Sequence, residues 1–197
     1  MERRSLLASL NGDGRMGWCL LACLTLLAAL ACGGLPWTEA LRYERGAIGQ
    51  GEWWRLLTGH WVHLGLRHLL PDAAGLLLLW ALYARELRPA AWLLVAACAT
   101  AAIDAGLWWG EPGVQWYVGI SGLLHAAWAA GAAAQAVRGQ RAGWLMLALL
   151  ASKLALEQRA GVSLFVAGFP VVTAAHVYGA IGGLVAVVAL ALTRKPL

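Results

Sequence analysis

Residues 119–122 read Gly-Ile-Ser-Gly, and the apolar run that begins at the serine continues to Val137. A second apolar run, residues 170–193, contains His176. Runs of about 17 or more apolar residues have the length of a membrane-spanning helix. Serine is a weak nucleophile until a neighbouring base takes its proton, and histidine is the usual base. The two runs therefore suggest a nucleophile and its base inside a membrane.

The composition of the 197-residue chain is that of a membrane protein. Hydrophobic residues make up 61% and charged residues 13% of the chain, whereas soluble domains carry about 25% charged residues. We therefore expect an all-α polytopic membrane protein without a separate soluble domain. The formal net charge is +5, but the Lys and Arg residues fall in short clusters between apolar runs, which indicates membrane topology rather than nucleic-acid binding. The four cysteines lack metal-ligand spacing and are interpreted as small hydrophobes in apolar segments: Cys19, Cys23, Cys32 and Cys98.

Six membrane spans can be drawn along the chain. They run over residues 16–35, 68–84, 90–108, 121–137, 142–156 and 170–193. The first is not interpreted as a cleavable signal peptide, because further spans follow and no small-residue cleavage site stands out. This division predicts one membrane domain over residues 16–193, a cytoplasmic N-terminal segment over residues 1–15 and a cytoplasmic tail over residues 194–197.

The basic residues predict the orientation, because cytoplasmic loops carry an excess of Lys and Arg. With both termini inside, the inner face carries nine such residues: Arg3, Arg4, Arg15, Arg85, Arg88, Arg138, Arg141, Arg194 and Lys195. The outer face carries six: Arg42, Arg45, Arg55, Arg67, Lys153 and Arg159. The tryptophans on the outer side fit an interfacial aromatic belt: Trp37, Trp53, Trp54, Trp61, Trp108, Trp109 and Trp116.

Three polar residues are predicted to lie at the same depth. His68, Ser121 and His176 precede the basic residues that end the second, fourth and sixth spans by 17, 17 and 18 positions. At about 1.5 Å per residue, each lies roughly 26 Å from the inner boundary, just below the outer surface of a hydrocarbon core about 30 Å thick. Gly179 and Gly183 have the small-xxx-small spacing that lets two membrane helices pack tightly. We expect them to bring His176 close to Ser121.

The surroundings of Ser121 suit acyl-transfer chemistry. The glycines at positions 119 and 122 would let a substrate backbone approach closely. A tetrahedral intermediate needs hydrogen-bond donors for its oxyanion. We expect the Ser121 backbone N–H to be one donor and His68 to be a second.

Four stretches together resemble the rhomboid intramembrane serine proteases. They are Gly-Ile-Ser-Gly at residues 119–122, the Ala-His-x-x-Gly-x-x-x-Gly pattern at residues 175–183, the histidine-rich segment Leu-Thr-Gly-His-Trp-Val-His-Leu-Gly-Leu-Arg-His at residues 57–68, and Trp54-Arg55. The resemblance covers residues 16–193. It implies a six-transmembrane-helix bundle without a metal or other cofactor.

The resemblance also implies a function. Ser121 would be the nucleophile and His176 the base of a Ser-His dyad, with Gly119 and His68 supporting the oxyanion. The substrates would be membrane-anchored proteins, cleaved near the outer membrane face. The compact chain and His125, four residues after Ser121, resemble the bacterial rhombosortase branch, which is associated with trimming C-terminal Gly-Gly-type sorting tails. The protein would then lie in a bacterial inner membrane with its active site towards the periplasm.

Two positions depart from the family pattern. The family usually has Asn four residues after the histidine of the second helix, and this chain has Asp72. An ionised Asp72 would repel an oxyanion, so it is either a protonated donor or an ionised structural group. His125 stands where the family often has an aromatic residue that stacks on the base. It either stacks on His176 or, one helical turn after Ser121, competes with it as the base.

Two other functions fit parts of the sequence. A non-catalytic rhomboid-like protein that binds transmembrane segments would typically lack the serine or the histidine, and both are present. A metalloenzyme could use the five histidines, although no tight ligand motif is evident: His60, His63, His68, His125 and His176.

The remaining polar residues of the outer side are expected to have structural or solvated roles. His60 and His63 are interpreted as interfacial or structural loop residues. We expect Asp104 to be solvated rather than to orient a histidine. Arg42, Glu44 and Arg45 are expected to form a solvated loop face, which leaves Ser121 and the histidines around it as the candidate chemistry.

Overall fold

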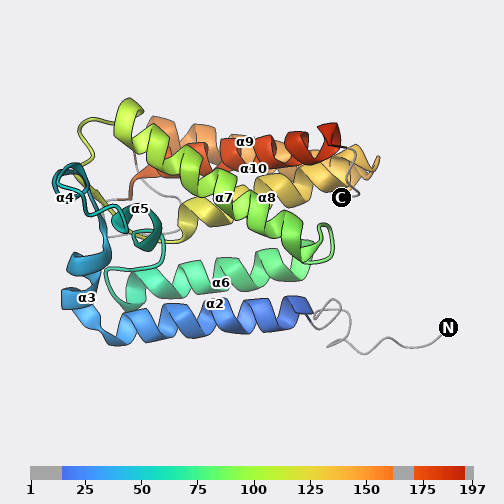
Figure 1. The fold of residues 1–197 in the computed structure, drawn as a ribbon. Coiled ribbons are helices and arrows are strands. Elements are labelled where there is room, and N and C mark those ends of the chain that lie inside the picture. The colour runs from blue at the N-terminus through green and yellow to red at the C-terminus, as the bar shows by residue number, and fades with distance from the viewer. Residues whose placement is uncertain (1–14, 162–170, 194–197) are drawn as a thin grey trace.

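The computed structural model of the chain describes residues 15–161 and 171–193 and is all-α apart from one short two-stranded sheet. Within these residues, six long helices form a bundle (Figure 1). They are α2 (Arg15–Cys32), α6 (Leu66–Tyr83), α7 (Pro89–Ala105), α8 (Ser121–Val137), α9 (Arg141–Ala160) and α10 (Thr173–Leu192). The predicted cytoplasmic ends lie outside the described residues, except for Arg15, the first residue of α2. Four of their basic residues are therefore not described: Arg3, Arg4, Arg194 and Lys195.

Short elements gather at one end of the bundle, on the left in Figure 1. They are α3 (Gly34–Leu41), β1 (Tyr43–Glu44), α4 (Arg45–Gly49), α5 (Arg55–Thr58), the π-helical turn η1 (Gly106–Gly110) and β2 (Trp116–Tyr117). β1 and β2 pair antiparallel, with Tyr43 opposite Tyr117. The sheet therefore ties the segment after α3 to the loop that leads into α8.

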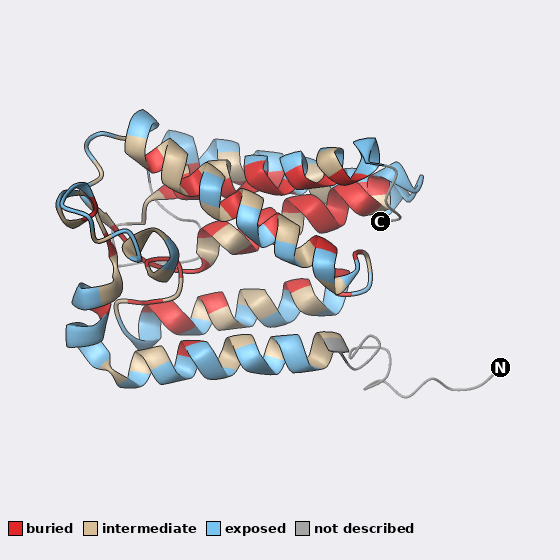
Figure 2. Ribbon diagram, viewed as in Figure 1, coloured by how far each residue is buried: buried red, intermediate tan, exposed pale blue. Residues whose placement is uncertain are grey.

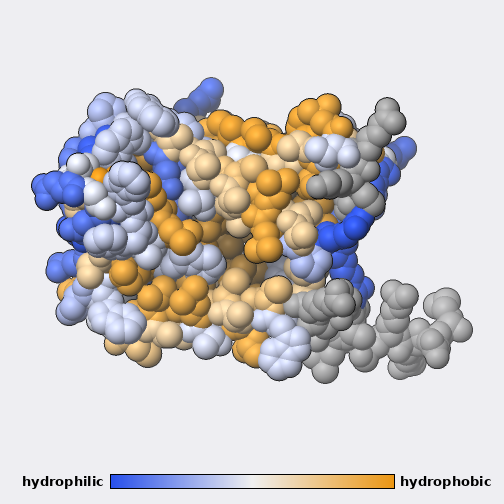
Figure 3. Space-filling model, in the orientation of Figure 1, coloured by the Kyte–Doolittle hydropathy of each residue, from blue (hydrophilic) through white to orange (hydrophobic). Residues whose placement is uncertain are grey.

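The protein is an integral membrane protein by the length and composition of its helices. Residues 89–110, which combine α7 and η1, and α10 are each long and apolar enough to span a membrane. The pair formed by α2 and α3 would be a third span, bent by 110°. Hydrophobic side chains cover the middle of the bundle and hydrophilic ones gather at both ends (Figure 3). Two or three of the described helices are thus long and apolar enough to cross a membrane, and the six spans stay a prediction.

Helix α8 lies at the centre of the bundle, in contact with α6, α7, α9 and α10. Only Val137 among its residues is exposed, and Figure 2 shows the helix as mainly buried or intermediate. Its inner stretch is rich in alanine and glycine, so neighbouring helices can approach its backbone. A Cβ at Gly183 of α10 would overlap the backbone of Ala126, and a Cβ at Gly131 would overlap the ring of Tyr83. Small residues of this kind permit close helix packing in membranes.

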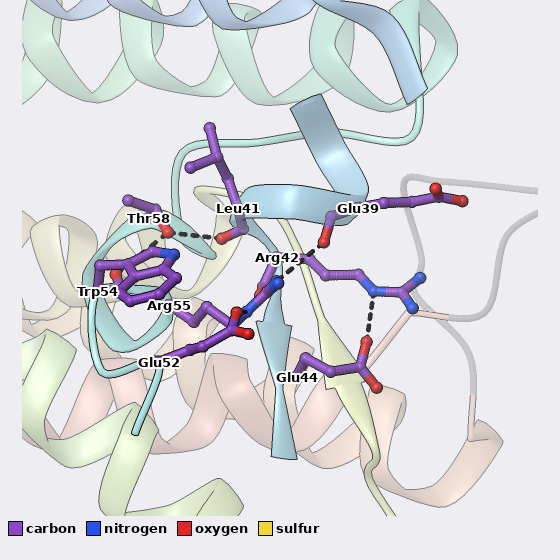
Figure 4. A network of polar contacts seen from close by, with 8 residues as sticks. All are labelled: Glu39, Leu41, Arg42, Glu44, Glu52, Trp54, Arg55 and Thr58. Atoms are coloured by element: carbon purple, nitrogen blue, oxygen red, sulfur yellow. Dashed lines mark hydrogen bonds and ion pairs between the residues drawn. The ribbon is translucent and has the colours of Figure 1, made fainter. Parts of the chain in front are cut away.

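The short elements at one end of the bundle and the segments between them are called the loop region here. In its first part, Arg55 of the Trp54-Arg55 pair joins α3 and α5 (Figure 4). Arg55 donates to the carbonyl oxygens of Glu39 and Arg42 at 2.8 and 3.0 Å and to Glu52 Oε2 at 2.6 Å. The Thr58 hydroxyl donates to another carbonyl of the same turn. These bonds hold the end of α3 against α5.

A second arginine holds the loop between α7 and β2, and it corrects the expectation of a solvated face. Arg45 donates to four backbone carbonyls, those of Leu107, Trp108, Glu111 and Val114. Its guanidinium also lies 5.0 Å from the ring centroid of Trp108. The expectation was wrong for Arg45 because a guanidinium has five donors and can satisfy a cluster of loop carbonyls that no secondary structure pairs.

Candidate active site

The turn before α8 presents Ser121 as the first residue of that helix. Gly119 has a φ of +112°, a conformation that favours glycine, and a Cβ there would lie 2.9 Å from His68 Nε2. The Gly119 amide donates to Gly59 O at 3.1 Å, and its carbonyl accepts from the Tyr117 hydroxyl at 2.7 Å. Burial raises the pKa of Tyr117, so this hydroxyl keeps its proton. Because Ser121 begins the helix, its N–H has no intrahelical acceptor.

Close packing of α10 on α8 brings His176 to Ser121. A Cβ at Gly179 would overlap the Gly122 backbone, so glycine at this position allows the two helices to touch. His176 is 2% exposed, and its Nε2 lies 3.0 Å from Ser121 Oγ. This is the distance of a nucleophile from its base.

His125 stacks on His176, with ring centroids 4.0 Å apart and an interplanar angle of 12°. Its Nδ1 lies 2.8 Å from the Ser121 carbonyl oxygen and its Nε2 lies 2.8 Å from Lys153 Nζ. Both ring nitrogens are therefore engaged away from Ser121 Oγ. Of the two roles left open for His125, the geometry favours stacking.

The Asp72 carboxylate lies among histidines. Its Oδ2 is 3.1 Å from His63 Nε2 and 3.8 Å from His68 Nε2, and the two imidazoles meet edge to face. Ring N–H groups are hydrogen-bond donors, so the surroundings suit a carboxylate that accepts. Of the two states left open for Asp72, the geometry favours the ionised structural group.

The loop residue His60 pairs with Asp104, which lies near the end of α7. His60 is 1% exposed, and its Nε2 lies 3.2 Å from Asp104 Oδ1. The Asp104 side chain is only 14% exposed. The expectation that Asp104 is solvated was wrong, because the loop carrying His60 folds over the end of α7 and supplies the carboxylate with a partner.

Two charged residues at the site, Lys153 and Glu157 on α9, were not predicted from the sequence. Glu157 is fully buried, with Oε2 2.9 Å from His176 Nδ1 and Oε1 2.7 Å from Lys153 Nζ. From the sequence, Lys153 was counted among the basic residues of the outer face although it lies within the predicted fifth span, and Glu157 fell just beyond that span. Helix α9 continues to Ala160 and contains both. Their i,i+4 spacing was the available signal, because paired charges within an apolar helix generally face the protein interior.

Two cavities border Ser121. One of about 420 Å³ lies between α6, α8 and α9 and is lined by His68, Pro71, Asp72, Ala74, Gly75, Leu78, Leu79, Ser121, Leu124, His125, Trp128, Lys153, Val171 and His176. The other, of about 360 Å³, follows the loop with β2 and is lined by His68, Gly113, Val114, Gln115, Trp116, Tyr117, Val118, Ser121, Val171 and Val172. Both contain Ser121 and His68, so a chain lying across them would pass the serine.

The described residues that could hold a metal together include only two of the five histidines, joined by Glu157. Within the part of the chain that the structure describes, the grouped metal-capable residues are His125, Glu157 and His176, with ligand atoms within 4.8 Å of one another. The Lys153 ammonium already lies 2.8 Å from His125 Nε2, where a cation would have to bind. His176 also uses both nitrogens, on Ser121 and Glu157. The donor set thus suits proton transfer better than metal binding.

Comparison with known proteins places the chain in a family. No curated protein matches the sequence. A protein-family model described as Rhomboid domain matches residues 50–193, which is most of the chain and includes Ser121 and His176. This family generally consists of intramembrane serine proteases. The chain therefore belongs to the rhomboid family.

Proposed function

We propose that the protein is an intramembrane serine protease that cleaves membrane-anchored proteins, with Ser121 as nucleophile and His176 as base. The observation that carries the proposal is the 3.0 Å separation of Ser121 Oγ and His176 Nε2 within a rhomboid fold. A non-catalytic binding protein would not need this pair. The two cavities beside Ser121 provide room for an extended substrate segment.

The reaction follows from the positions of these two side chains. Ser121 Oγ bonds to the carbonyl carbon of the scissile peptide while its proton passes to His176 Nε2. The C–N bond then breaks, and His176 Nε2 returns the proton to the leaving nitrogen. Water next adds to the acyl ester and gives a proton to His176 Nε2, which passes it to Ser121 Oγ as the ester bond breaks. The enzyme is restored and the new carboxylate leaves.

Two donors are proposed to stabilise the oxyanion, the Ser121 amide and the His68 ring. The amide stands at the N-terminus of α8, where the helix dipole favours negative charge. His68 Nε2 lies beside Gly119, and Asp72 and His63 behind it are proposed to hold the imidazole in place. Preorganised donors of this kind are usually a large part of catalysis in acyl transfer.

The membrane arrangement is proposed as the sequence predicted it. The six long helices would each cross a bacterial inner membrane, with residues 1–15 and 194–197 in the cytoplasm and Ser121 towards the periplasm. Exposed tryptophans at the end of the bundle that carries Ser121 fit a membrane–water interface at that end: Trp37, Trp53, Trp54 and Trp109. In this orientation the cleaved bond lies near the outer face.

The substrate is proposed to be a protein with a C-terminal sorting tail, in which a Gly-Gly-type motif precedes a hydrophobic helix and basic residues. Small residues suit this site because the scissile segment must reach a serine that begins a buried helix. The first test is therefore cleavage of a single-span reporter carrying such a tail, compared with the same reporter in which Leu-Leu replaces Gly-Gly. Equal cleavage of both reporters would remove the sorting-tail assignment and leave the protease assignment intact.

The catalytic assignment is tested in purified protein reconstituted in liposomes. Ser121→Ala and His176→Ala should each abolish cleavage and labelling by a fluorophosphonate probe, with unchanged thermal unfolding. Ser152→Ala, an exposed serine on α9, is the matched control and should behave as wild type. Residual activity within about tenfold of wild type in either site variant would remove that residue from the proposed role.

A further inference from the structure

A closed ring of polar contacts begins and ends at Ser121. From Ser121 Oγ it runs to His176 Nε2 (3.0 Å), from His176 Nδ1 to Glu157 Oε2 (2.9 Å), and from Glu157 Oε1 to Lys153 Nζ (2.7 Å). From Lys153 Nζ it continues to His125 Nε2 (2.8 Å), and His125 Nδ1 closes it on the Ser121 carbonyl oxygen (2.8 Å). The ring joins three helices, α8, α9 and α10.

Donor and acceptor chemistry fixes the direction of every bond in this ring. The Ser121 carbonyl only accepts, so His125 Nδ1 carries a proton and, in the neutral ring, His125 Nε2 is an acceptor. An ammonium only donates, so Lys153 satisfies both His125 Nε2 and Glu157 Oε1. The ionised Glu157 then accepts from His176 Nδ1. His176 Nε2 is left with the lone pair that must take the proton of Ser121.

The opposite charges of Lys153 and Glu157 balance each other in a place that is nearly closed to solvent. Glu157 is fully buried and Lys153 is 8% exposed. A carboxylate in such a place is stable in its ionised form when a cation is paired with it and its oxygens are hydrogen-bonded. Lys153 supplies the cation, and each oxygen of Glu157 has a partner.

We propose that Glu157 is a positioning residue that extends the proposed Ser-His dyad to a Ser-His-Glu arrangement, and that Lys153 keeps the Glu157 carboxylate ionised. The inference rests on the proposed function. Glu157 holds His176 in the tautomer with Nδ1 protonated and stabilises the imidazolium that forms when Ser121 attacks. The acid that performs this role comes from α9, and the nucleophile and base come from α8 and α10.

The competing explanation is that Glu157 and Lys153 form a purely structural salt bridge. Substitutions of Glu157 distinguish this structural role from a positioning role. Glu157→Gln keeps the shape but offers an amide, which cannot accept from both His176 and Lys153. In a soluble serine protease, the equivalent change costs about 10⁴-fold in kcat. We expect kcat to fall by at least about 100-fold with KM within about threefold, because tautomer and charge act on the transition state. Glu157→Asp keeps the charge and should recover a substantial part of the rate.

The matched control is Glu44→Gln, which removes the carboxylate of the partly exposed Arg42–Glu44 ion pair, away from Ser121 and His176 in the chain. It should leave kcat and KM unchanged. Each variant is assayed as the full chain in liposomes, by reporter cleavage and by the rate of fluorophosphonate labelling. Thermal unfolding is followed in parallel.

A double variant, Lys153→Met with Glu157→Leu, guards against loss of folding. Replacing a buried ion pair with apolar side chains of similar volume often leaves a protein stable. We expect a folded protein that has lost labelling and cleavage. Activity within about tenfold of wild type in this variant or in Glu157→Gln would overturn the inference. A wild type without any Ser121-dependent labelling or cleavage would instead overturn the proposed function.

Discussion

The imidazole of His125 lies flat against that of His176, 4.0 Å away and inclined by only 12°. A second histidine thus covers one face of the proposed base while its own nitrogens bind Ser121 O and Lys153. Stacking fixes the ring plane of His176, and the hydrogen bond from His176 Nδ1 to Glu157 fixes its rotation.

The stacking role predicts the effect of replacing His125. His125→Phe keeps an aromatic face against His176 and should retain activity within about tenfold of wild type, whereas His125→Ala should lose more, because the ring plane is no longer held. The measurement is kcat/KM on one reporter for both variants. An inactive but folded His125→Phe together with an active His176→Phe would reverse the assignment of the base.

The contact between α8 and α10 predicts that Gly179 tolerates no side chain. Gly179→Val would push the backbones apart at Gly122, next to Ser121. Overpacking of this kind typically costs about 1–3 kcal/mol of stability, and a shift of about 1 Å in a catalytic group can cost about 100-fold in rate. We expect both losses, measured by thermal unfolding and by kcat. Gly46→Ala is the control, since its Cβ would meet none of the described residues within 4 Å. A fully active Gly179→Val would contradict the proposed need for close packing.

The surroundings of Asp72 predict the pH behaviour of its variants. Because the Asp72 carboxylate lies 3.1 Å from His63 Nε2 and 3.8 Å from His68 Nε2, Asp72→Asn should lower activity at every pH by loosening the His68 ring. Asp72→Leu should be more severe, approaching the loss of about 100- to 1000-fold that follows removal of an oxyanion donor. The experiment is a pH–rate profile of wild type and both variants. If wild type lost activity at alkaline pH while Asp72→Asn kept it, Asp72 would instead be a protonated donor.

The ring around Lys153 predicts resistance to chelators. EDTA or 1,10-phenanthroline should leave the cleavage rate unchanged, because an ammonium stands where a metal would bind His125. Rates are compared before and after dialysis against chelator. Loss of activity that zinc restores would favour a metal held by His125, Glu157 and His176.

Much of the candidate site could be predicted from the sequence, because the rise per residue of an α-helix is constant. Counting residues to the basic inner ends put Ser121 and His176 at one depth, and the structure brings their side chains to 3.0 Å. The same charge rule misled at Lys153, which was counted among the basic residues of the outer face. The i,i+4 spacing of Lys153 and Glu157 is visible in the sequence, but their contacts with His125 and His176 depend on how α8 and α10 pack against α9.

The loop region was harder to predict because its order comes from contacts distant in sequence. The β1–β2 pairing, the carbonyls gathered by Arg45 and the His60–Asp104 pair each join segments that lie more than 40 residues apart. No periodic sequence pattern marks such contacts. The sequence around an isolated polar residue near a membrane boundary does not show whether water or another protein group makes its hydrogen bonds.

The enclosure of α8 by four other helices separates the proposed active site from the lipid. A bilayer that is too thick or too thin acts on helices that touch it, through tilt and local deformation. With only Val137 exposed, α8 has almost no surface on which such a force can act. The position of Ser121 is therefore set by the surrounding helices. A change in membrane thickness would shift the substrate relative to Ser121, and so change which of its bonds lies at the serine, before it moved Ser121 within the protein.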